Sequence, residues 1–271
     1  MSDQDKSPFT EHLGELRDRL VRSFIAVAIG FVAAYSFKEK LFEILNAPLI
    51  TAMGEDGNAK MIFTGLPEAF FTYLKVSLLT GIILATPVLF YEFWMFVSPG
   101  LYRTEKKYII PIVILSVFFF CIGSSFGYFI VFPYGFRFFL GFATDTIYAM
   151  PSMKEYLSFS SKMLLAFGFV FELPLVLTFM ARMGLVNVAF LKKNRKYAVL
   201  IFFIGAAIIT PPDVVTQIMM ALPLMVLYEI SIIGARVFGK KKAEEVDAED
   251  DEDLEEGEEI ASQKDTKTKE E

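Results

Sequence analysis

Apolar residues are concentrated in six runs along the chain, and short segments rich in polar and charged residues separate these runs. An α-helix needs about 20 mostly apolar residues to cross the hydrocarbon core of a bilayer, so the pattern predicts six membrane-spanning helices. The fifth run, "YAVLIFFIGAAIIT", has only about 14 residues, but the "TPPD" that follows it predicts a turn that returns the chain. The six runs lie near residues 21–37, 69–97, 109–132, 156–181, 197–210 and 214–238.

Composition supports a membrane protein of the helical class. Hydrophobic residues make up 54% of the 271 residues, 30 residues are Phe, and the mean hydropathy of +0.48 exceeds what an ordinary soluble domain carries. The alternating segments that are typical of an outer-membrane β-barrel do not occur. We therefore expect an all-α polytopic membrane protein whose membrane domain covers residues 21–238.

The distribution of basic residues predicts the orientation of these helices, because Lys and Arg in short loops resist translocation. With six spans both termini lie on one side, and that side carries about sixteen Lys and Arg against five on the opposite side. Both termini are therefore expected in the cytoplasm. About twenty polar or charged residues precede the first apolar run, so we expect no cleavable signal peptide, and the first span stays as a signal anchor.

The net charge of -6 combines two parts of opposite charge. Residues 243–271 contain fifteen acids and three lysines, which gives -12 for this segment and +6 for the rest of the chain. So acidic a segment without aromatic residues cannot bury enough surface to fold. We expect residues 239–271 to form a disordered, solubilising cytoplasmic tail, with a specific docking site as the less favoured alternative.

The inventory of reactive side chains argues against an enzyme. The only histidine is His12, so neither a histidine-based metal cluster nor a buried Ser-His dyad can be built. The phosphate-binding pattern GxxxxGK[ST] is absent from the sequence, and the single cysteine, Cys121, is expected to be a small packing residue. We expect no metal, no cofactor and no nucleic-acid partner, and any transport would draw its energy from a gradient or from partner proteins.

Residues 1–20 precede the first span and contain "PFTEHLGELRDRL", a pattern that predicts an amphipathic helix along the membrane surface. Glu15 and Arg19 are spaced i,i+4, and so are Asp18 and Arg22, which lies just after this segment. Two ion pairs are therefore expected. The first cytoplasmic loop, "FWMFVSPGLYRTEKKYIIP", places Glu105 before two lysines. By themselves these patterns favour an interfacial helix held by its own ion pairs, and a basic loop whose glutamate balances the lysines.

A lone carboxylate, Glu172, interrupts the apolar stretch "LAFGFVFELPLVLTFMAR". Its burial in a bilayer costs about 2.5 to 3.5 kcal/mol on insertion scales. Pro174 lacks a backbone donor and frees the carbonyl of Val170, so we expect a kink there and a concave, partly wet surface in front of Glu172. Alternatively, Glu172 hydrogen-bonds a neighbouring helix and holds the kink.

Two further positions are expected to shape the ends of helices. Asp213 in "TPPD" is expected to cap the sixth span, and Pro48 in "NAPLI" is expected to form a turn in the first periplasmic loop. A proton-coupled secondary transporter that uses Glu172 as a relay is the competing class of function. Such folds carry several polar groups at the midplane of two related halves, whereas this chain has one midplane charge and no visible internal repeat.

Four motifs, in this order and spacing, resemble the TatC family, the membrane receptor component of the twin-arginine protein translocation pathway. They are "HLGELRDRL", "FVSPGLYRTEKK", "YLSFSSKMLLAFGFVFELP" and "TPPDVVTQ". The resemblance covers about residues 9–238 and leaves only the acidic tail outside. One departure is Thr216, where serine is common in the family, and the hydroxyl group is kept.

The resemblance implies a cupped molecule in the bacterial cytoplasmic membrane that binds signal peptides with two consecutive arginines on folded cargo proteins. It implies that Glu172 lies at the concave face, that Pro48 can have a functional role, and that TatA- and TatB-type single-span proteins join the chain in a multimeric complex. The implied signal-peptide residues are Glu15, Arg17, Phe96 and Glu105, with Arg17 orienting a glutamate, and the implied docking residues for partner helices are Ala207, Ile208, Thr210 and Gln217.

Overall fold

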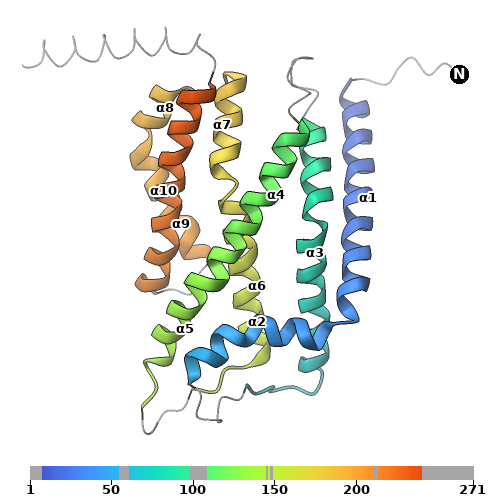
Figure 1. The fold of residues 1–271 in the computed structure, drawn as a ribbon, viewed down its shortest axis with the longest axis vertical. Coiled ribbons are helices and arrows are strands. Elements are labelled where there is room, and N and C mark those ends of the chain that lie inside the picture. Colours follow the sequence, from blue (N-terminus) through green and yellow to red (C-terminus); the bar gives the residue numbers. More distant parts are fainter. Residues whose placement is uncertain are drawn as a thin grey trace, which may run out of the picture. The chain divides into compact units, whose positions relative to one another are not determined.

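The computed structural model describes residues 8–54, 61–97, 109–144, 146, 149–209 and 213–239 of the chain. The regular structure of this part is helical, and an isolated β-bridge joins Ile62 to Ser152. The helices are α1 (Pro8–Tyr35), α2 (Lys38–Met53), α3 (Glu68–Val97), α4 (Ile109–Phe126), the π-helix η3 (Gly127–Val131), α5 (Phe132–Leu140), α6 (Met153–Val170), α7 (Leu173–Met183), α8 (Val188–Lys193), α9 (Arg195–Ile209) and α10 (Val214–Phe238) (Figure 1).

Among the described residues, four segments are long and apolar enough to cross a membrane, and they match the second, third, fourth and sixth predicted spans. They are Glu68–Val97, Ile109–Leu140, Met153–Met183 and Val214–Phe238. The first predicted span lies in α1, which satisfies the same criteria only together with α2, across a bend of 88°. The fifth corresponds to α9, whose 15 residues are short for a bilayer. The all-α polytopic membrane architecture predicted from the sequence is confirmed.

The chain divides into two compact units, Met1–Glu172 with Ala206–Met220, and Leu173–Gly205 with Ala221–Glu271. In the second unit, α7 ends at Met183 and is followed by Gly184, whose φ of 77° is a conformation that glycine adopts readily. The amide of Leu185 closes this helix end by donating to the carbonyl of Met180 at 3.0 Å. The Tyr228 hydroxyl donates to the carbonyl of Leu191 at 2.8 Å, which fastens α10 to α8.

Close packing of α1 against α3 organises the first unit, and the two helices lie side by side in Figure 1. Small residues recur every four positions on both contacting faces: Ala26, Gly30 and Ala34 on α1, and Ser77, Gly81 and Ala85 on α3. A Cβ atom added at Gly81 would lie 2.6 Å from the backbone nitrogen of Phe31. Such small-residue faces let helices approach closely in membranes, where packing and not hydrophobicity drives association.

The opposite face of α1 carries large apolar side chains that are exposed. Phe24, Ile25, Ile29 and Val32 are all exposed in the structure. Exposed apolar side chains at helical spacing are expected where a helix faces lipid tails. Helix α1 therefore combines an exposed apolar stripe, which we expect to face lipid, with a stripe that packs on α3.

The position of Pro48 corrects a prediction. The chain turns at residues 36–37, before α2, and Pro48 lies buried inside α2 instead of forming a loop turn. A proline within a helix leaves the carbonyl four residues earlier without its helical donor. The Tyr128 hydroxyl donates to that carbonyl, on Ile44, so a partner from η3 satisfies the group and α2 continues.

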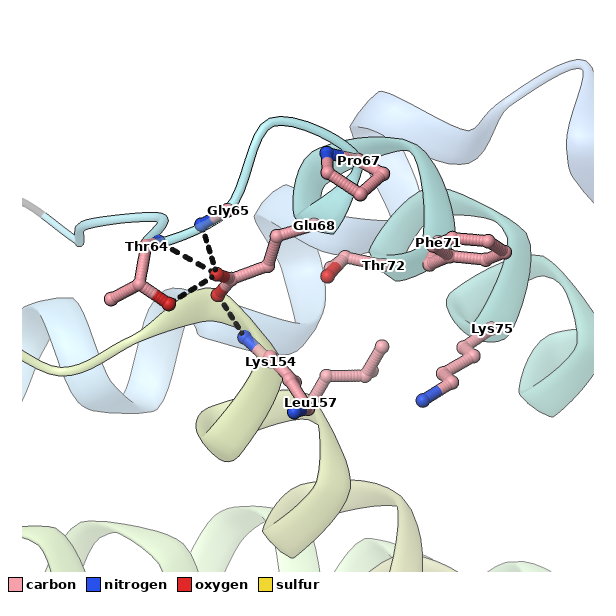
Figure 2. Close-up of a pocket in the computed structure, with 9 residues that line it drawn as sticks. All are labelled: Thr64, Gly65, Pro67, Glu68, Phe71, Thr72, Lys75, Lys154 and Leu157. Atoms are coloured by element: carbon pink, nitrogen blue, oxygen red, sulfur yellow. Dashed lines mark hydrogen bonds between the residues drawn. The ribbon is translucent and has the colours of Figure 1, made fainter.

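Glu68 ties together three segments at the end of α3 where that helix begins (Figure 2). One carboxylate oxygen accepts from the amide and hydroxyl of Thr64, at 2.7 and 3.0 Å, and from the amide of Gly65 at 3.3 Å. The other accepts from the hydroxyl of Ser152 at 2.6 Å and from the amide of Lys154 at 2.9 Å. Glu68 thus satisfies one of the free amides at the start of α6 from outside that helix.

Candidate functional site

The lead-in part of α1 forms a cluster of charges against the C-terminal part of α3. Arg19 bridges two carboxylates, since its Nε donates to Glu15 Oε1 at 3.0 Å and its Nη1 donates to Glu92 Oε2 at 3.1 Å. A second nitrogen of Arg19, Nη2, contacts the same oxygen of Glu15. The predicted pair of Glu15 and Arg19 is therefore confirmed, and a third member, Glu92, comes from a helix 73 residues further along the chain.

Burial differs sharply among the members of this cluster. The side chains of Arg19 and Glu92 are 14% and 7% exposed, whereas that of Glu15 is 34% exposed. Buried charges are tolerated where each is paired and hydrogen-bonded, and Arg19 meets this condition with two carboxylates. The cluster therefore has a buried inner part, and Glu15 opens to the surface.

Phe96 lies beside this cluster, near the end of α3, and the ring of His12 stacks on it. The ring centroids are 4.5 Å apart, and the planes are inclined by 15°. Phe96 is half-buried, and His12 Nδ1 lies 3.8 Å from Glu15 Oε2. An aromatic ring and a carboxylate thus share one surface, which can take a cationic group and a neighbouring apolar group of the same ligand.

The contacts of Arg17 differ from the expected ones. Its side chain is 77% exposed and pairs with the adjacent Asp18 at 2.8 Å, so Arg19 and not Arg17 orients Glu15. The expected pair of Asp18 with Arg22 is also replaced, because Arg22 reaches Glu92 at 3.7 Å. The reason is helix geometry: Arg19 and Arg22 are on the face of α1 that packs on α3, where a buried carboxylate outcompetes an exposed one. Glu105 lies outside the described residues.

Glu172 is buried, with 6% of its surface exposed, so the expected partly wet environment is wrong for the isolated chain. Its Oε1 atom has no hydrogen-bond partner among the described residues. The Ser116 side chain lies close to the same carboxyl group, and the Ser116 hydroxyl accepts from Trp94 Nε1 at 2.9 Å. Glu172, which follows α6, therefore faces a polar side chain of α4 whose own partner is on α3, and its hydrogen bond to a neighbouring helix stays a prediction.

The expected interruption at Pro174 is confirmed. Helix α6 ends at Val170 and α7 begins at Leu173, with a turn at residues 171–172 between them. Pro174 lies in the first turn of α7, where a missing backbone donor costs little. Glu172 therefore sits at a break between two helices and not within one.

Asp213 caps α10 as predicted. Its Oδ1 accepts from the amide of Thr216 at 2.7 Å, and its Oδ2 accepts from the hydroxyl of Thr216. The hydroxyl retained at Thr216 is thus part of the cap. Ala207 and Ile208, close to the end of α9, are exposed, and Gln217 is half-buried in the first turn of α10. Thr210 lies outside the described residues.

Comparison with known proteins identifies the family. A family model described as "Sec-independent protein translocase protein (TatC)" matches residues 11–223. The chain belongs to the TatC family. A TatC protein of Desulforapulum autotrophicum is 81% identical over 253 residues, 93% of each chain, and one of Magnetococcus marinus is 48% identical over 247 residues, 91% of this chain and 90% of its own.

A solved structure supports the same assignment. The structure described as "Crystal Structure of Twin Arginine Translocase Receptor- TatC" is 41% identical to this chain and superposes with a TM-score of 0.74. It covers 84% of this chain and 99% of its own. The resemblance of the four sequence motifs to the TatC family is therefore confirmed, and the chain is a multi-pass membrane protein of that family.

Sequence reasoning missed the role of Glu92. This residue is an acidic side chain within the apolar run 69–97, and the same signal drew attention to Glu172 in another run. An isolated carboxylate in a spanning segment predicts a partner or a functional site by default. The partner itself, Arg19, could not be read from the sequence because it lies on another helix.

Proposed function

We propose that this TatC chain is the receptor for twin-arginine signal peptides and a core component of a translocase that exports folded proteins. The observation that carries the proposal is the surface at the start of α1, where the Glu15 carboxylate already binds a guanidinium beside the half-buried ring of Phe96. A guanidinium presents a planar fork that a carboxylate accepts through two hydrogen bonds, which an ammonium group cannot reproduce.

In this proposal two carboxylates take the two arginines of the signal peptide. Glu15 is one of them, and Glu105 of the loop that follows α3 is the other. Phe96 offers an apolar surface to the hydrophobic residue after the arginine pair. Arg17, which pairs with Asp18, adjusts the charge at the edge of the site.

The surface is proposed to face the cytoplasm, where signal peptides are made. The excess of Lys and Arg on the side of both termini supports this orientation in the bacterial cytoplasmic membrane. The sequence contains no GxxxxGK[ST] motif for nucleotide hydrolysis. The proton-motive force and partner proteins are therefore proposed to supply the energy for export.

TatA- and TatB-type single-span proteins are proposed to dock where α9 ends and α10 begins. Ala207 and Ile208 expose an apolar surface there, and Gln217 brings an amide to the first turn of α10. Together with Thr210, this amide can hydrogen-bond a polar side chain on an incoming helix, an interaction of about 0.6 to 2 kcal/mol in membranes. Glu172 is proposed to hold the break at Pro174 through hydrogen bonds, with a proton relay as the alternative.

The test measures binding of a twin-arginine signal peptide and its twin-lysine variant to the purified chain. We expect wild type to prefer the arginine peptide and Glu15→Gln and Glu105→Gln to lose most of this preference. Glu43→Gln, which removes an exposed carboxylate from α2, is the matched control and should behave as wild type. Equal binding of both peptides to wild type, or unchanged binding in both site variants, would contradict the proposal.

A further inference from the structure

The charges of the described site are already balanced before any ligand binds. Three acidic side chains face three arginines of the same chain, and each acid has an arginine partner. The acids are Glu15, Asp18 and Glu92, and the arginines are Arg17, Arg19 and Arg22. A ligand with two guanidinium groups therefore meets carboxylates that are occupied, and its binding requires an exchange of partners.

The two arginines on Glu92 are held very differently. Arg19 is 14% exposed and hydrogen-bonds Glu15 and Glu92 together. Arg22 is 64% exposed, and its Nη1 lies 3.7 Å from Glu92 Oε1, which is beyond hydrogen-bond distance. Exposed ion pairs contribute little to stability, so Arg22 is the partner that can leave.

Departure of Arg22 would uncover a carboxylate oxygen suited to arginine. Glu92 Oε2 is fixed by Arg19, so the orientation of the Oε1 atom is set before a ligand arrives. The side chain of Glu92 is 7% exposed, and a guanidinium is more weakly hydrated than an ammonium group, so arginine loses less than lysine on entering this position. Glu15 is held by the same guanidinium of Arg19, which places two acceptors within reach of neighbouring arginines in one peptide.

We propose that Glu92 is a further binding residue for the arginine pair of the signal peptide, and that Arg22 holds its outer oxygen in the empty receptor and is displaced by the peptide. The proposal rests on the proposed receptor function and adds a site residue to it. Arg22 then acts as an internal competitor that only a well-fitting guanidinium replaces. This competition sharpens the discrimination between twin-arginine and twin-lysine peptides.

To test this proposal, binding of the two peptides is measured for the full chain and for its Arg22→Gln, Glu92→Gln and double variants. Arg22→Gln should raise the affinity for the twin-arginine peptide about two- to fivefold, the range that loss of an exposed ion pair permits. The affinity for the twin-lysine peptide should stay nearly unchanged. Glu92→Gln should lower the affinity for the twin-arginine peptide about tenfold, as expected for a lost charge-assisted hydrogen bond. In the double variant the gain from Arg22→Gln should disappear.

Glu43→Gln is the control, because it removes an exposed carboxylate from α2, outside the arginine cluster, and leaves Glu92 and its partners unchanged. It should change the affinity less than about twofold. A gain from Arg22→Gln that persists without Glu92, or that is equal for both peptides, is a general charge effect and overturns the proposal. Wild-type affinity in Glu92→Gln overturns it as well.

If Glu92→Gln folds poorly by thermal unfolding, the Arg22→Gln variant with the two peptides decides alone, since Arg22 is exposed. If wild type shows no preference for arginine and Glu15→Gln binds as wild type does, the receptor function itself fails, and this inference fails with it. If that preference exists and depends on Glu15, but Glu92→Gln binds both peptides as the Glu43→Gln control does, only this inference is overturned.

Discussion

Replacing Gly81 with alanine tests how closely α1 and α3 must approach for the protein to be stable. A Cβ atom at this position would lie 2.6 Å from the backbone nitrogen and 2.9 Å from the Cα atom of Phe31. Ordinary contacts of a Cβ atom are 3.4–4 Å, so the helices must separate by roughly 1 Å, because neither neighbour is a flexible side chain. The separation would weaken the contact between the small-residue faces of the two helices, which is centred on Gly30 and Gly81.

The magnitude follows from two opposing terms. Overpacking of this kind costs about 1–3 kcal/mol, and the higher helix propensity of alanine returns up to about 1 kcal/mol. We therefore expect Gly81→Ala to lower the free energy of unfolding by about 1–2 kcal/mol. For a chain of this size that corresponds to a decrease in Tm of about 2–8 °C.

Gly205 in α9 is the matched control, because a Cβ atom added there meets no atom within 4 Å. Gly205→Ala should leave the Tm unchanged or raise it, since alanine in place of glycine stabilises a helical position with open space by about 0.5–1 kcal/mol. Thermal unfolding of both variants in one detergent measures the difference. Equal Tm values for the two variants, or a more stable Gly81→Ala, would refute the close-packing argument.

Three other predictions concern single contacts or segments. If Glu172 acts through hydrogen bonds, export of a reporter at matched membrane levels should survive largely in Glu172→Gln and fall further in Glu172→Ala and Glu172→Leu, whereas a glutamine variant as inactive as alanine would favour a proton relay. Tyr128→Phe should lower the free energy of unfolding, measured by thermal unfolding, by about 1 kcal/mol because it leaves the carbonyl of Ile44 unpaired. The loss should be smaller in a Pro48→Ala background, where residue 48 regains a backbone donor, and equal losses in both backgrounds would disprove this account. A chain that ends at Lys242 should insert and support export nearly as wild type, and loss of export at normal protein level would identify the acidic tail as a docking element.

Local patterns were sufficient for several parts of the structure. The apolar runs predicted the spanning helices, because burial in lipid depends on the length and composition of one segment. The Glu15–Arg19 pair and the Asp213 cap were predictable for a similar reason, since both join residues three or four positions apart in the sequence. The family assignment also came from motifs that are contiguous in the chain.

The tertiary structure alone decided which residues that are far apart in the sequence become partners. The prediction for Pro48 failed because its helix is maintained by Tyr128, whose hydroxyl reaches Ile44 across 84 residues. Arg22 turned to Glu92 instead of Asp18 because the small-residue faces of α1 and α3 bring a buried carboxylate close. Sequence patterns specify which groups need a partner, but packing of the helices decides which distant group is near enough to provide one.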